Sequence, residues 1–241
     1  MTRSRAIVLH IQRYNDEAMI ADVLTEECGC VGMMVRVSRS RRAAVRHTLF
    51  RPLAVLEIVW DHRPHASLQR PRAVQTALPL SSVPYHPLKS AVALFLSEFL
   101  HHAVRTERDC REVFDYVARS VEWLDTCEEG FANFHLVFLL RLTRFLGIEP
   151  NTEGAAAGSY FDLRSSCFVP TQPLHADFLR PEDARLVPLL LRMSYGNMRV
   201  FRFSGAERSR LLSCLNTYYR LHLPGFPELR SLAVLREMFE C

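Results

Sequence analysis

Apolar residues in the first eighty positions fall into short runs separated by polar or turn-forming segments, which is the pattern of β-strands. Asp22 and Glu57 interrupt one face of their runs, whereas the flanking apolar residues keep the other face. No helical pattern of comparable length lies between these runs. Five short strands in so few residues favour a small closed barrel, and a five-stranded OB-fold is the simplest one. The expected strands span 6–11, 18–25, 31–37, 53–60 and 67–78.

The hydrophobic period becomes helical at about residue 88, after the proline-containing stretch "SSVPYHP" at 81–87. The segment 131–147 is apolar on almost every side and is expected to be a buried central helix that Gly147 ends. A loop and then a hairpin at 160–169 are expected next. The other expected helices span about 88–104, 109–126, 181–194, 205–222 and 228–240.

These patterns together predict an α+β protein with two domains. Residues 1–80 would form the OB-fold barrel and bind nucleic acid. Residues 81–241 would form a mainly helical domain, with an irregular or hairpin segment at about 149–180.

Positive charge is concentrated in the predicted barrel. The 241-residue chain carries a net charge of +4, yet residues 1–80 hold 12 arginines against 7 acids, and the rest is nearly balanced. Lys89 is the only lysine. A GC-rich genome would explain arginine in place of lysine, but it would not explain the clustering. The asymmetry indicates a polyanionic partner for the first third of the chain.

The stretch "RVSRSRRAAVRHTLFRP" at 36–52 has six arginines and no acid, and the nearest acids are Glu27 and Glu57. It connects two predicted strands of a barrel, where loops often bind ligands. We expect these side chains to contact phosphates, with bases left free because only Tyr14 and Phe50 could stack on them. A solvated loop without a partner is the alternative. The expected DNA-binding residues are Arg13, Arg36, Arg39, Arg41, Arg42, Arg46 and Arg51.

Motifs of catalysis and metal binding are missing. Cys28 and Cys30 lack the spacing of a zinc site, and neither His62 with His65 nor His101 with His102 has a further ligand nearby in sequence. Nucleotide-binding, serine-hydrolase and metalloprotease signatures do not occur. We therefore expect no catalytic residue, no metal and no cofactor, and a protein that is not an enzyme. A hydrolase with a spatially assembled site is the least favoured alternative.

The bulk sequence also predicts the cellular compartment. The apolar run near the N-terminus is too short for a signal peptide, and no uncharged segment approaches the ~20 residues of a membrane span. Seven scattered cysteines are typical of reduced thiols. A cytoplasmic, nucleoid-associated protein with no membrane partner is expected.

Arg141 and Arg144 interrupt the apolar helix 131–147. Basic groups beside an apolar surface suit an acidic peptide with a hydrophobic end. The alternative is that these side chains only extend to solvent near the negative end of the helix dipole.

The order of these features resembles the family of the DNA repair protein RecO. The resemblance runs through "VLTEECGCVGMMVRVSRSRR", "LFRPLAVLEIVW", "FLSEFLHHAVR" and "LLRLTRFLGIEPN". Thr25 and Gly29 match a T-x-x-x-G core that precedes a basic loop in the family. The similarity is a pattern over most of the chain rather than a catalytic signature.

This resemblance implies an OB-fold followed by a helical domain, and a recombination mediator without enzymatic activity. Such a mediator binds and anneals single-stranded DNA, works with RecR, and helps load RecA onto DNA coated by single-strand-binding protein. It also implies that the acidic tail of the coating protein docks on the helical domain, for which Arg141 and Arg144 are the expected residues. Many members carry a four-cysteine zinc module, but only Cys167 remains here, so a form without zinc is expected.

Two readings of another class remain open on the sequence. One is an adaptor whose basic loop binds an acidic protein, and the other is an RNA-binding OB protein. Binding of double-stranded DNA, the oligomeric state and the residues that contact RecR are left undetermined.

Overall fold

The computed structural model describes the chain except for residues 38–44, 64–65, 106–109 and 241. The chain forms two compact units. The first contains Met1–Thr126 and Leu229–Phe239, and the second contains Cys127–Glu228. The sequence-based boundary at residue 80 stays a prediction.

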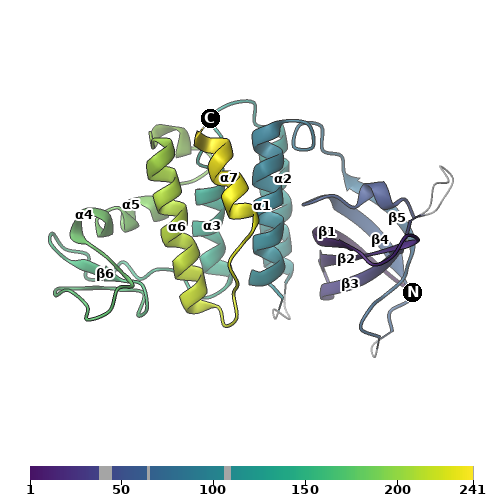
Figure 1. The fold of residues 1–241 in the computed structure, drawn as a ribbon, viewed down its shortest axis with the longest axis horizontal. Helices are drawn as coiled ribbons and strands as arrows, with labels where there is room; N and C mark the ends of the chain where they lie inside the picture. Colours follow the sequence, from purple (N-terminus) through teal and green to yellow (C-terminus); the bar gives the residue numbers. More distant parts are fainter. Residues whose placement is uncertain (38–44, 64–65, 106–109, 241) are drawn as a thin grey trace. The chain divides into compact units, whose positions relative to one another are not determined.

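The first unit begins with a five-stranded barrel (Figure 1). Neighbouring strands are antiparallel in the order β3-β2-β1-β4-β5. A parallel bridge between Met33 and Gln69 joins β3 to the segment before β5, where Met34 N donates to Gln69 O at 2.8 Å. This closure gives the OB-fold topology that the sequence predicts. The strands are β1 (Thr2–Arg13), β2 (Ala18–Thr25), β3 (Gly29–Arg36), β4 (Val55–Trp60) and β5 (Pro71–Leu78).

Alternation along the strands fills the barrel with apolar side chains, including Val23, Met33, Ile58 and Trp60, which are all fully buried. The closing segment passes close to Gly32 on β3. A Cβ on Gly32 would lie 2.8 Å from Leu68 Cδ2, so a larger residue at this position would require the Leu68 side chain to shift.

The β2–β3 turn explains the spacing of Thr25 and Gly29. The Thr25 hydroxyl donates to Gly29 O at 2.7 Å and accepts from Cys28 N at 3.0 Å. Gly29 has a φ of 67°, which favours glycine. This turn therefore sets the register of β2 against β3, in which Thr25 pairs with Gly29 and Ala18 with Arg36.

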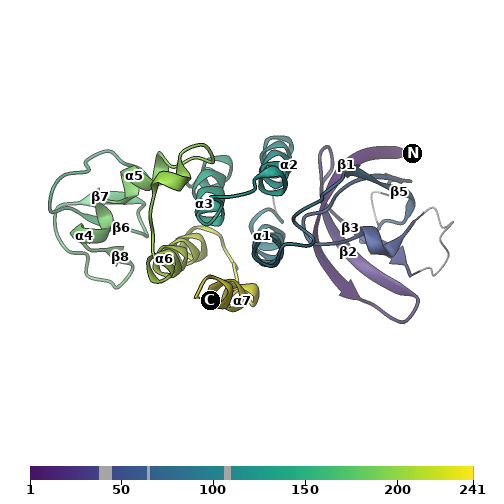
Figure 2. The same cartoon turned by 90° about the horizontal axis from the view of Figure 1, so that it is seen from above.

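Two antiparallel helices follow the barrel in the same unit, α1 (Pro87–Ala103) and α2 (Arg111–Thr126), and Figure 2 shows them side by side. The buried carboxylate of Asp125 accepts from the backbone N–H groups of Ser81, Ser82 and Val83 at 2.7–2.9 Å. Lys89, which is 2% exposed, donates through Nζ to Ser82 Oγ at 2.8 Å and to Asp125 O at 3.2 Å. These bonds fix the connection between the barrel and both helices.

The last helix, α7 (Ser231–Glu240), also belongs to the first unit. Glu98 of α1 accepts from the backbone N–H groups of Arg230 at 3.0 Å and Ser231 at 2.8 Å, and from the Ser231 hydroxyl. A carboxylate at this position satisfies free N–H groups and complements the helix dipole. The end of the chain is thereby attached to α1.

The second unit is built around α3 (Phe134–Phe145), which is apolar on nearly every side and packs against α5 and α6. The expected single helix at 181–194 is wrong, because it is two short helices separated at Arg185 and Leu186. Pro188 has no N–H with which to continue the first helix. The expected hairpin at 160–169 gains a third strand. The elements are β6 (Tyr160–Asp162), β7 (Cys167–Val169), β8 (Phe178–Leu179), α4 (Pro181–Ala184), α5 (Val187–Leu191) and α6 (Gly205–His222).

Replacement of Asp125 by asparagine is expected to lower the free energy of unfolding by about 3 kcal/mol at pH 7, because three buried N–H groups lose a charged acceptor. Burial by itself would raise the pKa of Asp125, but the N–H donors of residues 81–83 hold this pKa below its ordinary value. The stabilisation is therefore present above about pH 4 and is lost as pH falls through the lowered pKa. Urea unfolding from pH 7 to pH 2.5 should show the two proteins converging in acid. Asp16→Asn, at an exposed position, is the control, and a constant difference across pH would contradict the assignment.

His135 of α3 makes the stability of the second unit depend on pH with the same sign, because stability is again lost in acid. Burial, with a smaller contribution from Arg208, lowers the pKa of His135 from 6.5 to about 3. Between these values the unfolded chain binds a proton that the folded chain does not, so stability falls as pH decreases below 6.5, by up to about 1.4 kcal/mol per pH unit. We expect His135→Leu to flatten this slope in urea titrations at pH 7.5 and 5.5. The exposed His62→Leu should leave the slope unchanged, and an unaltered slope in His135→Leu would refute the assignment.

Candidate nucleic-acid interface

One group of barrel arginines is neutralised by carboxylates. Arg3 Nη2 lies 2.7 Å from Glu57 Oε1, and Arg5 contacts both carboxylate oxygens of Glu26 at 2.9 Å. Hydrogen bonds from these arginines hold the pKa of Glu57 and of Glu26 below its ordinary value. The Arg5 guanidinium also lies over the Phe114 ring, 5.1 Å from its centroid. These cations are therefore engaged within the protein.

A second group of barrel arginines is exposed and has no carboxylate oxygen within 4.0 Å among the described residues. Arg36 is the last residue of β3. Two more flank the 3-10 helix η1 (His47–Leu49), and two lie in the connection from β4 to β5. This uncompensated charge is what a polyanion would contact. The group consists of Arg36, Arg46, Arg51, Arg63 and Arg70, and is called the barrel arginine surface below.

The segment around η1 holds its two arginines against the barrel. Phe50 is 5% exposed and is part of the barrel core, and Val45 and Leu49 pack against that core. Leu49 N donates to Arg46 O at 3.1 Å, and Ala54 N donates to Arg51 O at 2.9 Å. The backbones of Arg46 and Arg51 are therefore fixed by apolar packing and hydrogen bonds, while their side chains face solvent.

Strand register places Arg13 at the same end of the sheet as Arg36. Arg13 pairs with Met19 and Arg36 with Ala18, on the two sides of the beginning of β2. Arg13 forms an ion pair with Asp16, and the two side chains are 76% and 90% exposed. An ion pair this exposed contributes little stability, so it is easily exchanged for a phosphate.

Sequence reasoning missed Arg63 and Arg70. Gln69, which is 5% exposed, accepts from Arg63 N and donates to Arg63 O, both at 2.9 Å, so it ties this loop to the barrel closure. A signal for these arginines was present in the sequence, since no acid occurs from residue 62 to residue 97. Their position beside β3 follows only from the parallel bridge at Met33.

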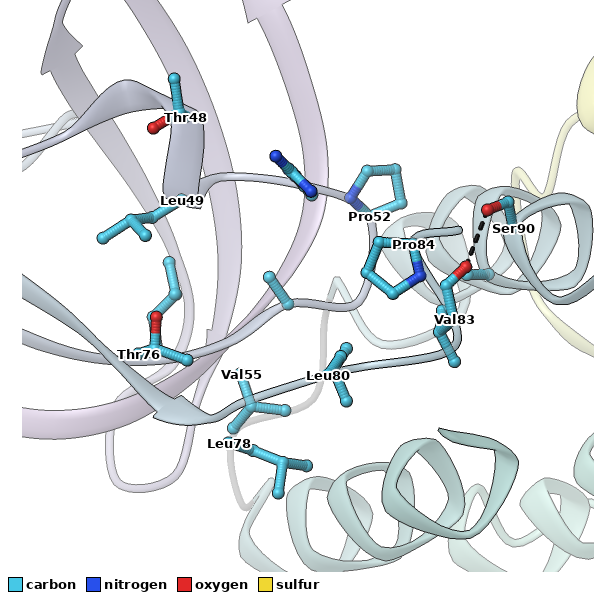
Figure 3. Close-up of a pocket in the computed structure, with 14 residues that line it drawn as sticks. Thr48, Leu49, Pro52, Val55, Thr76, Leu78, Leu80, Val83, Pro84 and Ser90 are labelled. Atoms are coloured by element: carbon cyan, nitrogen blue, oxygen red, sulfur yellow. Dashed lines mark hydrogen bonds between the residues drawn. The ribbon is translucent and has the colours of Figure 1, made fainter. Parts of the chain in front are cut away.

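A groove of about 570 Å³ adjoins Arg51 (Figure 3). It lies between η1, the end of β5 and the beginning of α1, and Leu49, Leu78 and Leu80 give it an apolar lining. Ser90 Oγ donates to Val83 O at 2.7 Å beside it. An apolar groove next to an exposed guanidinium can accept a planar group that carries negative charge.

The other predicted site residues have different outcomes. Arg39, Arg41 and Arg42 lie outside the described residues, and their role stays a prediction. In the second unit, Arg141 Nε donates to Met193 O at 3.4 Å, whereas Arg144 Nε lies 3.5 Å from Glu149 Oε2. Both side chains are exposed, but they contact different segments. Their role in binding an acidic tail also stays a prediction.

The described residues contain no group of three or more His, Cys, Asp or Glu side chains placed to hold a metal ion. The six cysteines in this part of the chain are all free. In the same residues, no helix combines the length and the apolar character that crossing a membrane requires.

Comparison with known proteins gives two family matches that together cover nearly the whole chain. The model named Recombination protein O N terminal matches residues 1–79, and Recombination protein O C terminal matches residues 85–233. The chain is 46% identical over 239 residues to the DNA repair protein RecO of Phocaeicola vulgatus, covering 99% of both chains. It is 46% identical over 241 residues to the same protein of Bacteroides fragilis, covering 100% of both, and 35% identical over 241 residues to that of Porphyromonas gingivalis, covering 98% of both. The chain therefore belongs to the recombination protein O family and has a role in DNA repair and recombination.

Proposed function

We propose that the protein is a recombination mediator that binds single-stranded DNA on its barrel and anneals complementary strands. The observation that carries this proposal is the barrel arginine surface, five exposed cations without a carboxylate neighbour in the described chain. Membership of a DNA repair family supplies the class of polyanion. Arg13, Arg39, Arg41 and Arg42 extend the same surface in this proposal.

Phosphate contacts explain how such a surface promotes annealing. Two strands repel each other through their phosphates, and arginines that replace the counterions reduce this repulsion. Contacts to the backbone leave the base edges free to pair. The surface offers few stacking partners, because Tyr14 is 62% exposed but Phe50 is buried in the barrel core. Of the two aromatic residues that the sequence offered as stacking candidates, Phe50 is therefore not accessible to a base, whereas Tyr14 is.

The groove beside Arg51 gives a place for one base in this proposal. Its lining by Leu49, Leu78 and Leu80 would cover the apolar face of the ring while Arg51 contacts a neighbouring phosphate. Such contacts accept any base, so binding would depend strongly on salt and weakly on sequence.

The remaining partners follow from the family. In this proposal the protein works with RecR and helps load RecA onto DNA coated by single-strand-binding protein, whose acidic tail binds at Arg141 and Arg144. It carries out no covalent chemistry. An adaptor for an acidic protein is the alternative that uses the same arginines, and an RNA-binding protein is the other.

Replacement of Arg36, Arg46, Arg51 and Arg70 together by alanine is expected to weaken binding of single-stranded DNA and to reduce its salt dependence. Each phosphate contact on a single strand contributes about 0.7 to the slope of log affinity against log salt, so four lost contacts lower the slope by roughly 3. Fluorescence anisotropy of a labelled 30-nucleotide strand, measured over a salt series, gives this slope.

The matched control removes four arginines of the same unit that form ion pairs, namely Arg3, Arg72, Arg111 and Arg119. It removes the same total charge and should leave most of the slope intact. An equal reduction of the salt slope in both variants would show that DNA binding depends only on net charge, and it would contradict the barrel arginine surface. If the unchanged protein binds no DNA but binds an acidic peptide tightly, the adaptor is favoured. If it binds RNA much more tightly than DNA, the RNA-binding protein is favoured.

A further inference from the structure

The second unit carries its own group of arginines without ionic partners. The segment "RMSYGNMRVFRF" at 192–203 lies within a stretch that has no acid between Asp183 and Glu207. Arg192, Arg199 and Arg202 are exposed, and so is Arg141 of α3. Within the described chain, none of the four has a carboxylate oxygen within 4.0 Å, although four other arginines of this unit do. We call these four residues the α3 arginine surface.

Hydrogen bonds hold this segment along α3. Asn133, which is 4% exposed, donates through Nδ2 to Met198 O at 3.1 Å and to Phe201 O at 2.7 Å. Asn197 closes the preceding turn, since its Oδ1 accepts from Ser194 N at 2.7 Å and its Nδ2 donates to Arg192 O at 3.1 Å. The arginines are therefore mounted on an ordered backbone rather than on a free loop.

The contacts to α3 also set the spacing of the charges. Asn133 contacts the end of the segment that carries Arg199 and Arg202, and Arg141 contacts Met193 beside Arg192. Eight residues of helix rise about 12 Å. At 3.4 Å per phosphate in a stacked strand, this length spans three or four phosphates. Cations carried near both ends of that length suit the spacing of a nucleic-acid backbone.

Aromatic and apolar side chains lie among these arginines. Tyr195 stacks on Phe134 with ring centroids 5.0 Å apart and an angle of 15° between the rings. Phe201 and Phe203 are half-buried with centroids 6.1 Å apart, and Val200 is 74% exposed. Arginines interspersed with aromatic rings are typical of surfaces that bind single strands.

Two acids that precede Gly130 do not cancel this charge. Gly130 lies close to Arg199, because a Cβ on Gly130 would be 3.5 Å from Arg199 Cβ. Glu128 and Glu129 immediately precede Gly130 in the sequence. Both glutamates are exposed, and no ion pair within 4.0 Å joins either of them to a described arginine. Solvated carboxylates of this kind screen the surface only weakly.

We propose that the α3 arginine surface binds the phosphate backbone of a second single strand of DNA. The proposal rests on the proposed function, in which the barrel arginine surface holds the first strand. An acidic peptide with a hydrophobic end would need an apolar pocket beside the cations. One apolar cavity among the described residues of this unit, about 60 Å³, is lined by Leu136, Leu140 and Leu211 among others, and by none of the four arginines. Arg192, Arg199 and Arg202 therefore suit a repeating anion, and Arg141 is the one residue that this surface shares with the proposed site of the acidic tail.

The test replaces Arg192, Arg199 and Arg202 together by alanine in the full chain and measures two quantities. The first is the rate at which two complementary 30-nucleotide strands, labelled for energy transfer, anneal at a protein concentration that saturates the first strand. The second is the anisotropy of one labelled strand in a salt series. We expect annealing to slow at least tenfold, whereas saturation of a single strand through the barrel persists. In a protein that already lacks Arg36, Arg46, Arg51 and Arg70, the triple variant should remove the residual DNA binding.

The matched control replaces Arg164, Arg210 and Arg220, which form ion pairs in the same unit, and should anneal within twofold of the unchanged protein. Equal annealing by the triple variant and the unchanged protein would overturn the second surface. Loss of binding to an acidic peptide with unchanged annealing would overturn it as well, because the surface would then be a peptide site. If the unchanged protein binds no single strand, the proposed function fails first, and this outcome is distinct from failure of the second surface alone.

Discussion

The barrel and the first two helices depend on a buried polar contact at residues 81–89. Lys89 is buried, and its Nζ is satisfied by Ser82 Oγ and the carbonyl of Asp125. The carboxylate of Asp125 in turn accepts from three consecutive N–H groups of the connection. Buried polar groups are costly unless such bonds are made, so these bonds favour the observed path of the chain out of β5. The carboxylate of Glu98 likewise accepts from the first N–H groups of α7, so the first unit contains both β1 and α7.

Pairing with carboxylates decides which arginines are available to a partner. The barrel uses Arg3 and Arg5 in contacts to Glu57 and Glu26, where they help hold strands and helices together. The cations at the end of β3, around η1 and before β5 have no such contact among the described residues. The same division occurs in the second unit, where Arg210 pairs with Asp183 whereas Arg199 has no carboxylate oxygen within 4.0 Å in the described part of the chain. In a chain with a single lysine, the arginines without a carboxylate neighbour among the described residues are therefore the cations available to an anionic partner.

In the proposed function, neutralisation on two surfaces would favour the joining of two strands. A single cationic site that fills with one strand becomes an anionic complex and repels the next strand. A second, independent set of cations would reduce the repulsion of the second strand. For this, the protein backbone that carries these cations must be held in place so that the charges stay close together. The bonds of Asn133 and Asn197 supply that fixation in the second unit.

The sequence by itself determined the strands of the barrel and the positions of the long helices, because alternation and helical periodicity are local signals. It also located the basic stretch around Arg36 and Arg46, since charge clustering needs no tertiary knowledge. It failed where distant residues meet. The helix broken before Pro188, the burial of Phe50 and the position of Arg63 and Arg70 beside β3 all depend on packing or on the bridge at Gln69. Whether an arginine is free or paired is likewise a property of the neighbours that the fold brings to it, so only the tertiary structure could separate Arg36 from Arg3.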